Sequence, residues 1–191
     1  MSGDFHCKVH GLDELLSDLG EIEDLLGKVV VEVVETAGDA VVDKAKAGID
    51  TGRGEWEPLA EATIAMKGHG KALIDSRLLR DSIAGWWEGA TRPNAQETGV
   101  YSVGIPFGVT YPDGTPLEMV AVLMEEGATI SIDTESRKVL EGKRIDVSKG
   151  AKVIRIPPRP FLEPAMNEVA DTFEEVVAES MNRLYDRLLK G

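Results

Sequence analysis

Residues 154–165 read IRIPPRPFLEPA and join an extended segment to the last helix of the chain. The alternation before the prolines predicts a strand over 152–156. Proline cannot continue the interior of a sheet, and Pro160 biases Arg159 away from helical angles. We therefore expect a rigid elbow that fixes the direction of the helix beginning near Leu162.

Both ends of the chain carry long amphipathic patterns. After the elbow, apolar residues recur at three- and four-residue steps as far as Leu188, and charged residues cover the other face. The same spacing runs from Leu12 to Ile49, which predicts one long helix or two in succession. Its valine-rich middle is unfavourable for a helix, and its weak points are Gly20, Gly27 and Gly38.

The middle of the chain mixes short helices and short strands. Pro58 suits the first turn of a helix that ends near Lys67, and RLLRDSIAG predicts a second one. Residues 119–126 favour a helix ended by a glycine. Strands are predicted at 4–10, in GWWEGA and GVYSVGIPF, and at TISI and KVIRI. We expect a single α+β domain over 1–191, with a small antiparallel or mixed β-sheet flanked by a long N-terminal helical segment and a long C-terminal helix.

The composition favours an acidic globular protein. The 191 residues carry 21 Lys and Arg against 34 Asp and Glu, a net charge of −13, which argues against a general DNA-binding surface. Cys7 is the only cysteine, so an internal disulfide is excluded. No apolar run reaches the roughly 20 residues that span a bilayer, and the first residues lack the pattern of a secretory signal. We expect the chain to act in a cytoplasm, without a membrane partner.

The segments that invite a catalytic or metal-binding interpretation lack the full pattern. GHGKA at 68–72 misses the first glycine and the Ser or Thr of a phosphate-binding loop. In HCKVH, strand alternation points Cys7 away from His6 and His10, so these three cannot converge on a metal. His69 lies between glycines, a poor place to fix a catalytic imidazole. We predict no catalytic, cofactor-binding or metal-binding residues and no enzymatic activity.

Residues 133–152 form a charged arm in which Lys and Arg outnumber Asp and Glu, whereas the whole chain has a negative net charge. Seven Lys and Arg stand against four Asp and Glu between 133 and 155. One interpretation is a solvated hairpin tip with mixed charge. The other is a projecting arm that docks on an acidic neighbour, such as a second copy of the chain. In that case the docking cations would be Arg137, Lys138, Lys143 and Arg144.

Other stretches stand out by their order along the chain: WEPLAEATIAMKG (56–68), LIDSRLLRDSI (73–83), MVAVLMEEGATI (119–130) and IPPRPFLEPAM (156–166). Together they resemble segments of phage virion-morphogenesis and tail-completion (neck) proteins, Mu-like and P2-like. The first resembles the W-x-P-L signature, the second an L-x-(D/T)-(S/T)-G-x-L-x-x-S-I segment, and the third a helix ending in an acid and a glycine. The last matches the P-x-R-P-F-L hallmark and is the most specific. Arg77 departs from the pattern, because glycine is usual there.

The resemblance implies a structural protein of a tailed bacteriophage, at the neck or the head-proximal end of the tail. Such proteins form homo-oligomeric rings, here expected to be hexameric, that complete the tail or join it to the head. The implied partners are further copies of the chain and other neck, connector, tail-terminator or tail-tube proteins, with DNA only passing through the ring lumen. The chain would then be found in the virion, and in host cytoplasm during assembly. The alternative is a phage-encoded hydrolase with an unrecognised carboxylate or histidine site.

The elbow and its surroundings supply the candidates for interface or structural roles. We expect the Arg159 guanidinium to pair with Glu125 or Glu126 and so to anchor the prolines. Trp56 is either a core residue or an interface anchor, as are Trp86 and Trp87. Besides the four cations of the arm, the candidates are Arg159, Pro160, Phe161, Leu162, Trp56, Glu125 and Glu126.

Overall fold

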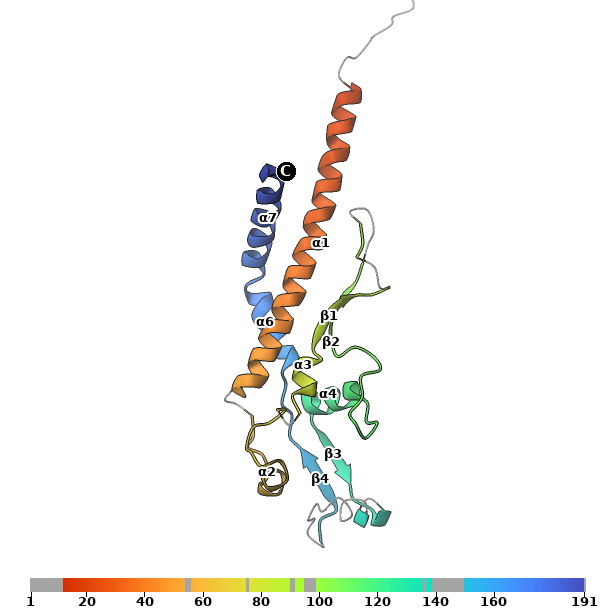
Figure 1. Cartoon of the computed structure of the whole chain (residues 1–191), viewed down its shortest axis with the longest axis vertical. Coiled ribbons are helices and arrows are strands. Elements are labelled where there is room, and N and C mark those ends of the chain that lie inside the picture. Colours follow the sequence, from red (N-terminus) through yellow and green to blue (C-terminus); the bar gives the residue numbers. More distant parts are fainter. Residues whose placement is uncertain are drawn as a thin grey trace, which may run out of the picture.

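The computed structural model describes residues 12–53, 56–74, 76–89, 92–94, 99–135, 137–138 and 150–190. The α+β class expected from the sequence is confirmed, and Figure 1 shows an elongated molecule built along one long helix. The strand predicted at 4–10 lies outside the described residues. In chain order the elements are α1 (Leu12–Thr51), α2 (Glu61–Lys67), α3 (Leu78–Asp81), β1 (Ala84–Trp87), β2 (Tyr101–Gly104), α4 (Leu117–Glu126), β3 (Ala128–Ser131), β4 (Val153–Ile156), α6 (Leu162–Asp171) and α7 (Phe173–Lys190).

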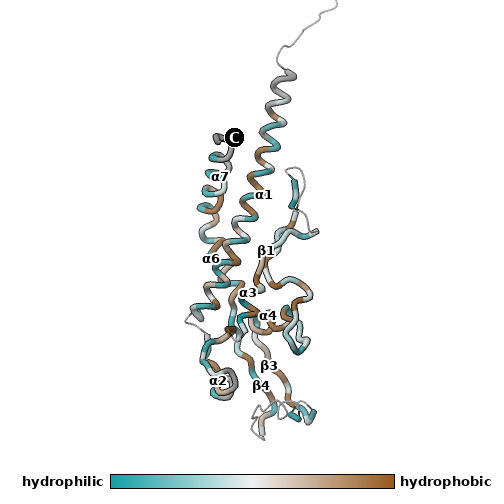
Figure 2. Tube along the Cα trace, in the orientation of Figure 1, coloured by the Kyte–Doolittle hydropathy of each residue, from teal (hydrophilic) through white to brown (hydrophobic). Residues whose placement is uncertain are grey.

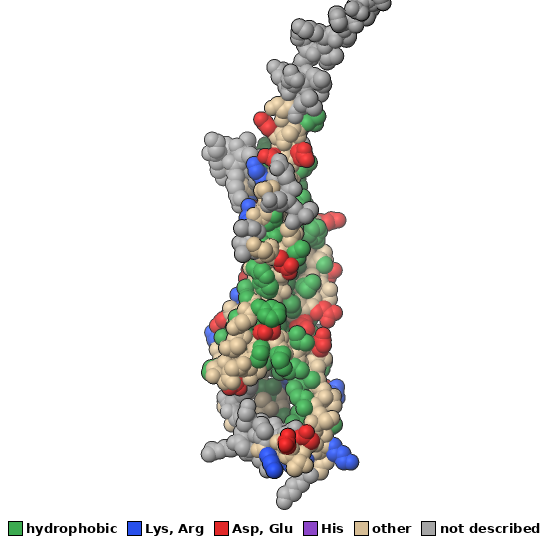
Figure 3. Space-filling model, turned by 90° about the vertical axis from the view of Figure 1, so that its right-hand side faces the viewer, with side chains coloured by type: hydrophobic (Ala, Val, Ile, Leu, Met, Phe, Trp, Pro, Cys, Tyr) green, Lys and Arg blue, Asp and Glu red, His purple; other side chains and the backbone are tan. Residues whose placement is uncertain are grey.

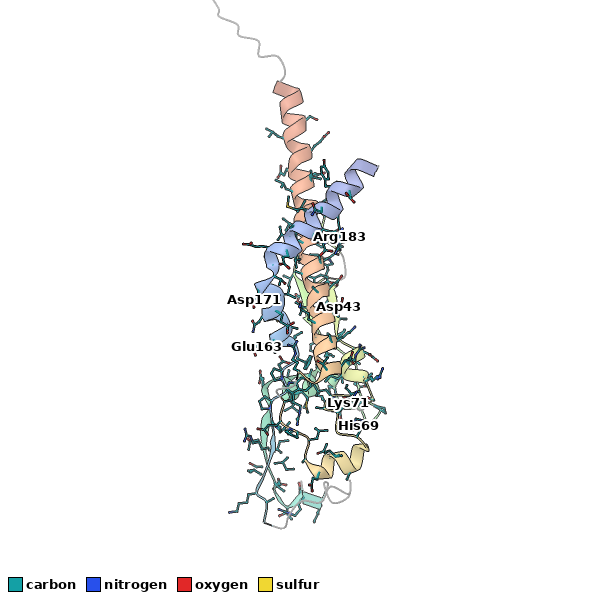
Figure 4. All side chains as sticks on the ribbon, turned by 90° about the vertical axis from the view of Figure 1, so that its left-hand side faces the viewer. Asp43, His69, Lys71, Glu163, Asp171 and Arg183 are labelled. Carbon is teal, nitrogen blue, oxygen red and sulfur yellow. The ribbon has the colours of Figure 1, made fainter. Side chains whose placement is uncertain are left out.

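The N-terminal pattern forms a single helix of 40 residues, α1, that its glycines do not interrupt. Its valines include Val33 and Val41, whose side chains are buried. Tertiary packing therefore outweighs their unfavourable helix propensity. In Figure 1, α6 and α7 lie on one side of α1 and the β1–β2 pair lies on the other. The start of α1 extends beyond the end of α7 in Figures 1 and 4. In the first half of α1, Leu19 and Leu26 are exposed.

The C-terminal pattern forms two helices, so the prediction of one long helix was wrong at this point. The break falls at Thr172, which has φ −108° and ψ 17°. Its hydroxyl donates a hydrogen bond of 3.1 Å to the carbonyl of Glu168, one turn earlier. Such back-bonding by threonine competes with the helical ladder and bends helices. The apolar face continues across the break, because Val169 and Val176 are both buried.

The strands form two separate antiparallel pairs in place of one sheet. The first pair runs from Ala84 opposite Gly104 to Trp87 opposite Tyr101. The second, β3–β4, projects away from α1 at the bottom of Figure 1. The described residues of the 133–152 arm lie at the far end of this second pair, and Lys143 and Arg144 are outside the described residues.

The hydrophobic core lies where the C-terminal half of α1 meets α3, α4 and α6. In Figure 2, apolar (brown) stretches of these elements lie in the same part of the molecule. Core packing thus joins segments from both ends of the chain with its middle. The buried apolar residues of this cluster are Val41, Val42, Ala45, Ile49, Leu79, Ile83, Leu117, Phe161, Ala165, Val169 and Val176.

Candidate functional site

The proline segment, residues 157–161, crosses the end of α4 at very short range. The backbone N–H of Arg159 donates to the carbonyl of Met124 over 2.6 Å. Gly127, which ends α4, has φ 72°, and a Cβ at this residue would lie 2.8 Å from the carbonyl oxygen of Ile156. Only glycine tolerates both the left-handed backbone and this approach. The glycine that follows the acidic end of the third similar stretch is thus required by the structure.

Glu125 caps the helix that follows the proline segment. Its carboxylate accepts the backbone N–H groups of Phe161 at 2.9 Å, Leu162 at 3.1 Å and Glu163 at 2.7 Å. These N–H groups have no partner inside α6, and a negative charge at a helix N-terminus is favourable. Glu125 therefore holds the start of α6 against the end of α4.

Arg159 is buried, with 5% of its surface exposed. Its Nη2 donates to the carbonyl of Glu57 over 3.2 Å and its Nη1 lies 3.5 Å from the carbonyl of Pro157. Its Nε is buried and has no hydrogen-bond partner among the described residues. Burial lowers the pKa of the Arg159 guanidinium below its ordinary value.

The expected ion pair of Arg159 with Glu125 or Glu126 is not formed. The three N–H groups at the start of α6 occupy the Glu125 carboxylate, and the side chain of Glu126 is exposed. The two residues indicated by the sequence, Arg159 and Glu125, are thus both structurally important, but the predicted pairing between them was wrong. Arg159 is anchored through backbone carbonyls, which leave no trace in the sequence.

Trp56 and Phe161 are held in the body of the protein. Trp56 is half-buried against the core, and its Nε1 donates to the carbonyl of Pro160 over 3.3 Å. Phe161 is 2% exposed and belongs to the core, and Leu162 packs against the same cluster. Phe161 is thus a core residue, and Trp56 packs against the core while one side of it lines an open pocket.

These contacts bring three of the four similar stretches together. We call the assembly of Trp56, Glu57, Met124, Glu125 and residues 159–163 the motif cluster. The second stretch reaches the same core through Leu79 and Ile83. Its residue Arg77 has φ 59°, a left-handed conformation, at the position where the resemblance leads one to expect glycine.

An open pocket of about 470 Å³ lies beside the motif cluster, and we call it the proline pocket. Arg53, one of its lining residues, donates a hydrogen bond to the carboxylate of Glu168, which also accepts from Lys44 at 3.3 Å. Arg53 and then Lys44 hold the pKa of Glu168 below its ordinary value. The lining residues are Arg53, Trp56, Pro158, Pro160 and Pro164.

Other charged groups form ion pairs between distant segments. Arg80 contacts Asp50 through two bonds of 2.6 and 2.7 Å and lowers the pKa of that carboxyl. Arg92 contacts Glu35 in the same way, and the Trp87 indole donates to Glu35 over 2.7 Å. These pairs were not predicted, since the partners are 30 to 57 residues apart and no local spacing marks them.

The remaining candidates are not brought into one site. Arg137 donates to the carbonyl of Ala151 over 2.6 Å, within the base of the charged arm. Figure 4 shows His69 and Lys71 after α2, well apart from Asp43 and Asp171 on the helices. Within the described ranges, no group of three or more His, Cys, Asp or Glu side chains is placed to hold a metal ion. Among the helices that the structure describes, none has both the length and the apolar character to cross a bilayer.

No family model, no curated protein and no solved structure matches the chain.

Proposed function

We propose that this protein is a structural component of a tailed-phage virion that assembles into a ring at the neck or the head-proximal end of the tail. The observation that carries the proposal is the motif cluster. Residues from separated stretches that resemble the virion-morphogenesis family contact one another through a helix cap and backbone hydrogen bonds. These shared residues hold the fold together, and other residues on the surface are left to contact partners in an assembly.

Arg77 adds independent support. The resemblance places a glycine at this position, and glycine is the residue that adopts positive φ without strain. Arg77 has φ 59° there. A backbone that requires a left-handed residue at the same point of the pattern is what the resemblance would lead one to expect.

The alternative of a hydrolase has less support. The carboxyls with clearly lowered pKa values, Glu35, Asp50 and Glu168, owe them first to hydrogen bonds from Arg92, Arg80 and Arg53. Such pairs stabilise the charged form, whereas a general acid or base near neutral pH needs a pKa close to 7. They are typical of structural ion pairs.

Assembly with virion components tests the proposal. Light scattering after size exclusion should show a closed oligomer, and negative-stain images should show rings, alone or on the ends of tail tubes. A protein that stays monomeric at all concentrations and never joins tails or heads would contradict the proposal. In the ring, the partners would be further copies of the chain and the neighbouring neck, connector, tail-terminator or tail-tube proteins.

A further inference from the structure

Phe107 is the most exposed large hydrophobic residue that the structure describes. Its exposed fraction is 94%, and the next highest is 62%, at Tyr185. Removing an aromatic ring from water is worth more than removing almost any other side chain. A ring left this open on an otherwise ordered segment is therefore a candidate contact residue.

The segment around Phe107 is firmly held. Ile105 and Val109, on either side of it, pack against the core. The N–H of Leu117 donates to the carbonyl of Val109 over 2.8 Å, and Thr110 bridges to Pro116. The ring is therefore displayed by a segment whose conformation is already fixed, and binding through it costs little ordering entropy.

The proline pocket has the chemistry to receive an aromatic ring. Three prolines and the Trp56 indole offer apolar surfaces, and the hydrogen bond to Pro160 fixes the indole. Arg53 in the lining, which is paired with Glu168, supplies a guanidinium that would attract the face of an aromatic ring. The volume of about 470 Å³ falls within the range of pockets that bind small ligands, so a phenyl ring and the preceding Pro106 can enter.

The ring and the pocket lie on different sides of the molecule. In Figure 1 the end of α1 and residues 56–60 lie on the left, and residues 105–116 lie on the right beyond α4. Phe107 therefore cannot fill the pocket of its own chain. A second copy of the chain can bring the two together.

We propose that Phe107 of one copy inserts into the proline pocket of the next copy, head to tail. This inference rests on the proposed function and names the contact that would build the ring. Two different patches meet in such a contact, so it leaves a free Phe107 side chain on one copy and a free proline pocket on the other. Repetition then gives a closed ring, or a filament if the rotation does not close.

The inserted Phe107 side chain must be surrounded by a wider interface between the two copies, since stable interfaces bury roughly 1,000 Å² or more. Val100, Met119 and Val122 are also exposed. Figure 3 shows hydrophobic side chains gathered along the side of the molecule that carries β1, β2 and α4. Each copy carries a net charge of −13, so the copies repel one another and added salt should strengthen this apolar contact.

The first test is Phe107→Ala, followed by light scattering across a concentration series. We expect the self-association constant to fall by about 30-fold or more, as for a central interface residue. The melting temperature of the dissociated protein should not change, because the ring is exposed. Tyr185→Ala removes another exposed aromatic side chain, on α7, and should leave association unchanged.

A mixing experiment tests the head-to-tail pairing itself. Pro164→Gln places a longer polar side chain in the pocket without adding charge, and it should also abolish association. When Phe107→Ala and Pro164→Gln proteins are mixed, each pair of copies keeps one Phe107 side chain and one intact proline pocket. We expect a heterodimer that grows no further, at concentrations at which each variant alone is mostly monomeric.

Cross-linking makes the contact visible even when association is weak. In a Cys7→Ser background that keeps Phe107, Pro106→Cys and Pro164→Cys together should give a ladder of linked copies on oxidation, and each alone should not. If Phe107→Ala associates as strongly as the wild type, or if no ladder forms, this inference is wrong while the proposed function stands. A wild-type protein that neither oligomerises nor joins tails would instead contradict the proposed function, and the inference with it.

Discussion

The carboxylate of Glu125, at the end of α4, accepts the backbone N–H of Phe161 over 2.9 Å and so caps a helix that begins 37 residues later in the chain. Side-chain caps are usually local, within the same turn. Here the cap belongs to another element and fixes the angle between α4 and α6.

We expect Glu125→Ala to lower the free energy of unfolding by about 1–2 kcal/mol, the cost of losing an N-cap. Glu125→Gln should cost less, because the amide oxygen still accepts one of the N–H groups. Urea denaturation followed by circular dichroism measures both. Glu126→Ala is the matched control, an exposed acid next in sequence, and should change stability by less than about 0.5 kcal/mol. Equal losses for the two alanine variants would show that the cap contributes nothing.

Arg159 gives a second prediction, because its stem and its charge have opposite effects. The buried stem packs in the motif cluster, while the guanidinium has an unpartnered Nε and is desolvated by burial, an effect that the charge of Glu57 only partly opposes. Arg159→Ala should cost about 2–4 kcal/mol through lost packing. Arg159→Met keeps an unbranched apolar stem and removes a buried charge, so its stability should stay within about 1 kcal/mol of wild type.

Thermal and urea unfolding of the two variants separate these contributions. If Arg159→Met were as destabilising as Arg159→Ala, the hydrogen bonds to Glu57 and Pro157 would be the main stabilising interaction in place of the stem.

The fold class and the long helices followed from periodicity, because a stripe of apolar residues at helical spacing is a local property of the sequence. The strand before the prolines was predicted at 152–156 and forms at Val153–Ile156. The break at Thr172 was not predicted, since the apolar face continues across it. Two separate strand pairs were also not predicted, because strand pairing depends on contacts that no local pattern records.

The residues of the candidate site could be predicted from the sequence, but the hydrogen bonds between them could not. Arg159, Phe161, Trp56 and Glu125 were all singled out, and all four lie in or beside the motif cluster. Their partners are mostly backbone carbonyls and N–H groups, which every residue carries. Sequence therefore cannot distinguish a guanidinium that contacts a carboxylate from one that contacts a carbonyl. Phe107 was overlooked because the sequence placed it at the end of the predicted strand GVYSVGIPF, and no local pattern shows that its side chain is left exposed.

Two glycines of α1 give predictions of opposite sign. A Cβ at Gly38 would lie 2.3 Å from a ring carbon of Tyr101, whose hydroxyl bonds Asp39 over 2.7 Å. Gly38→Ala should therefore be destabilising by about 1–3 kcal/mol, despite the higher helix propensity of alanine. A Cβ at Gly20 would meet no atom within 4 Å among the described residues, so Gly20→Ala should be stabilising by about 0.5–1 kcal/mol.

Melting temperatures of the two variants give the comparison directly. A stabilising Gly38→Ala would mean that Tyr101 moves aside at little cost, and that its contacts with α1 and with Trp87, at a ring separation of 5.1 Å, are loosely held.

The last prediction concerns acid stability and Glu35. Hydrogen bonds from Arg92, and then from Trp87, hold the pKa of Glu35 below its ordinary value of 4.5, against the opposing effect of burial. The unfolded chain therefore takes up this proton before the folded protein does. The stability that the charged carboxylate contributes is fully present above about pH 4.5 and is lost as the pH falls through the lower, folded pKa. We expect Glu35→Gln to cost about 1 kcal/mol at pH 7 and progressively less below pH 4.5.

The measurement is urea unfolding at a series of pH values between 7 and 3. Glu23→Gln, an exposed change on the same helix, is the matched control and should follow the wild-type curve at every pH. The difference between wild type and Glu35→Gln should narrow as the pH falls, because both proteins then carry an uncharged side chain beside Arg92. Curves that stay parallel down to pH 3 would show that the charge of Glu35 adds nothing, and that its hydrogen bond from Trp87 is the whole of its contribution.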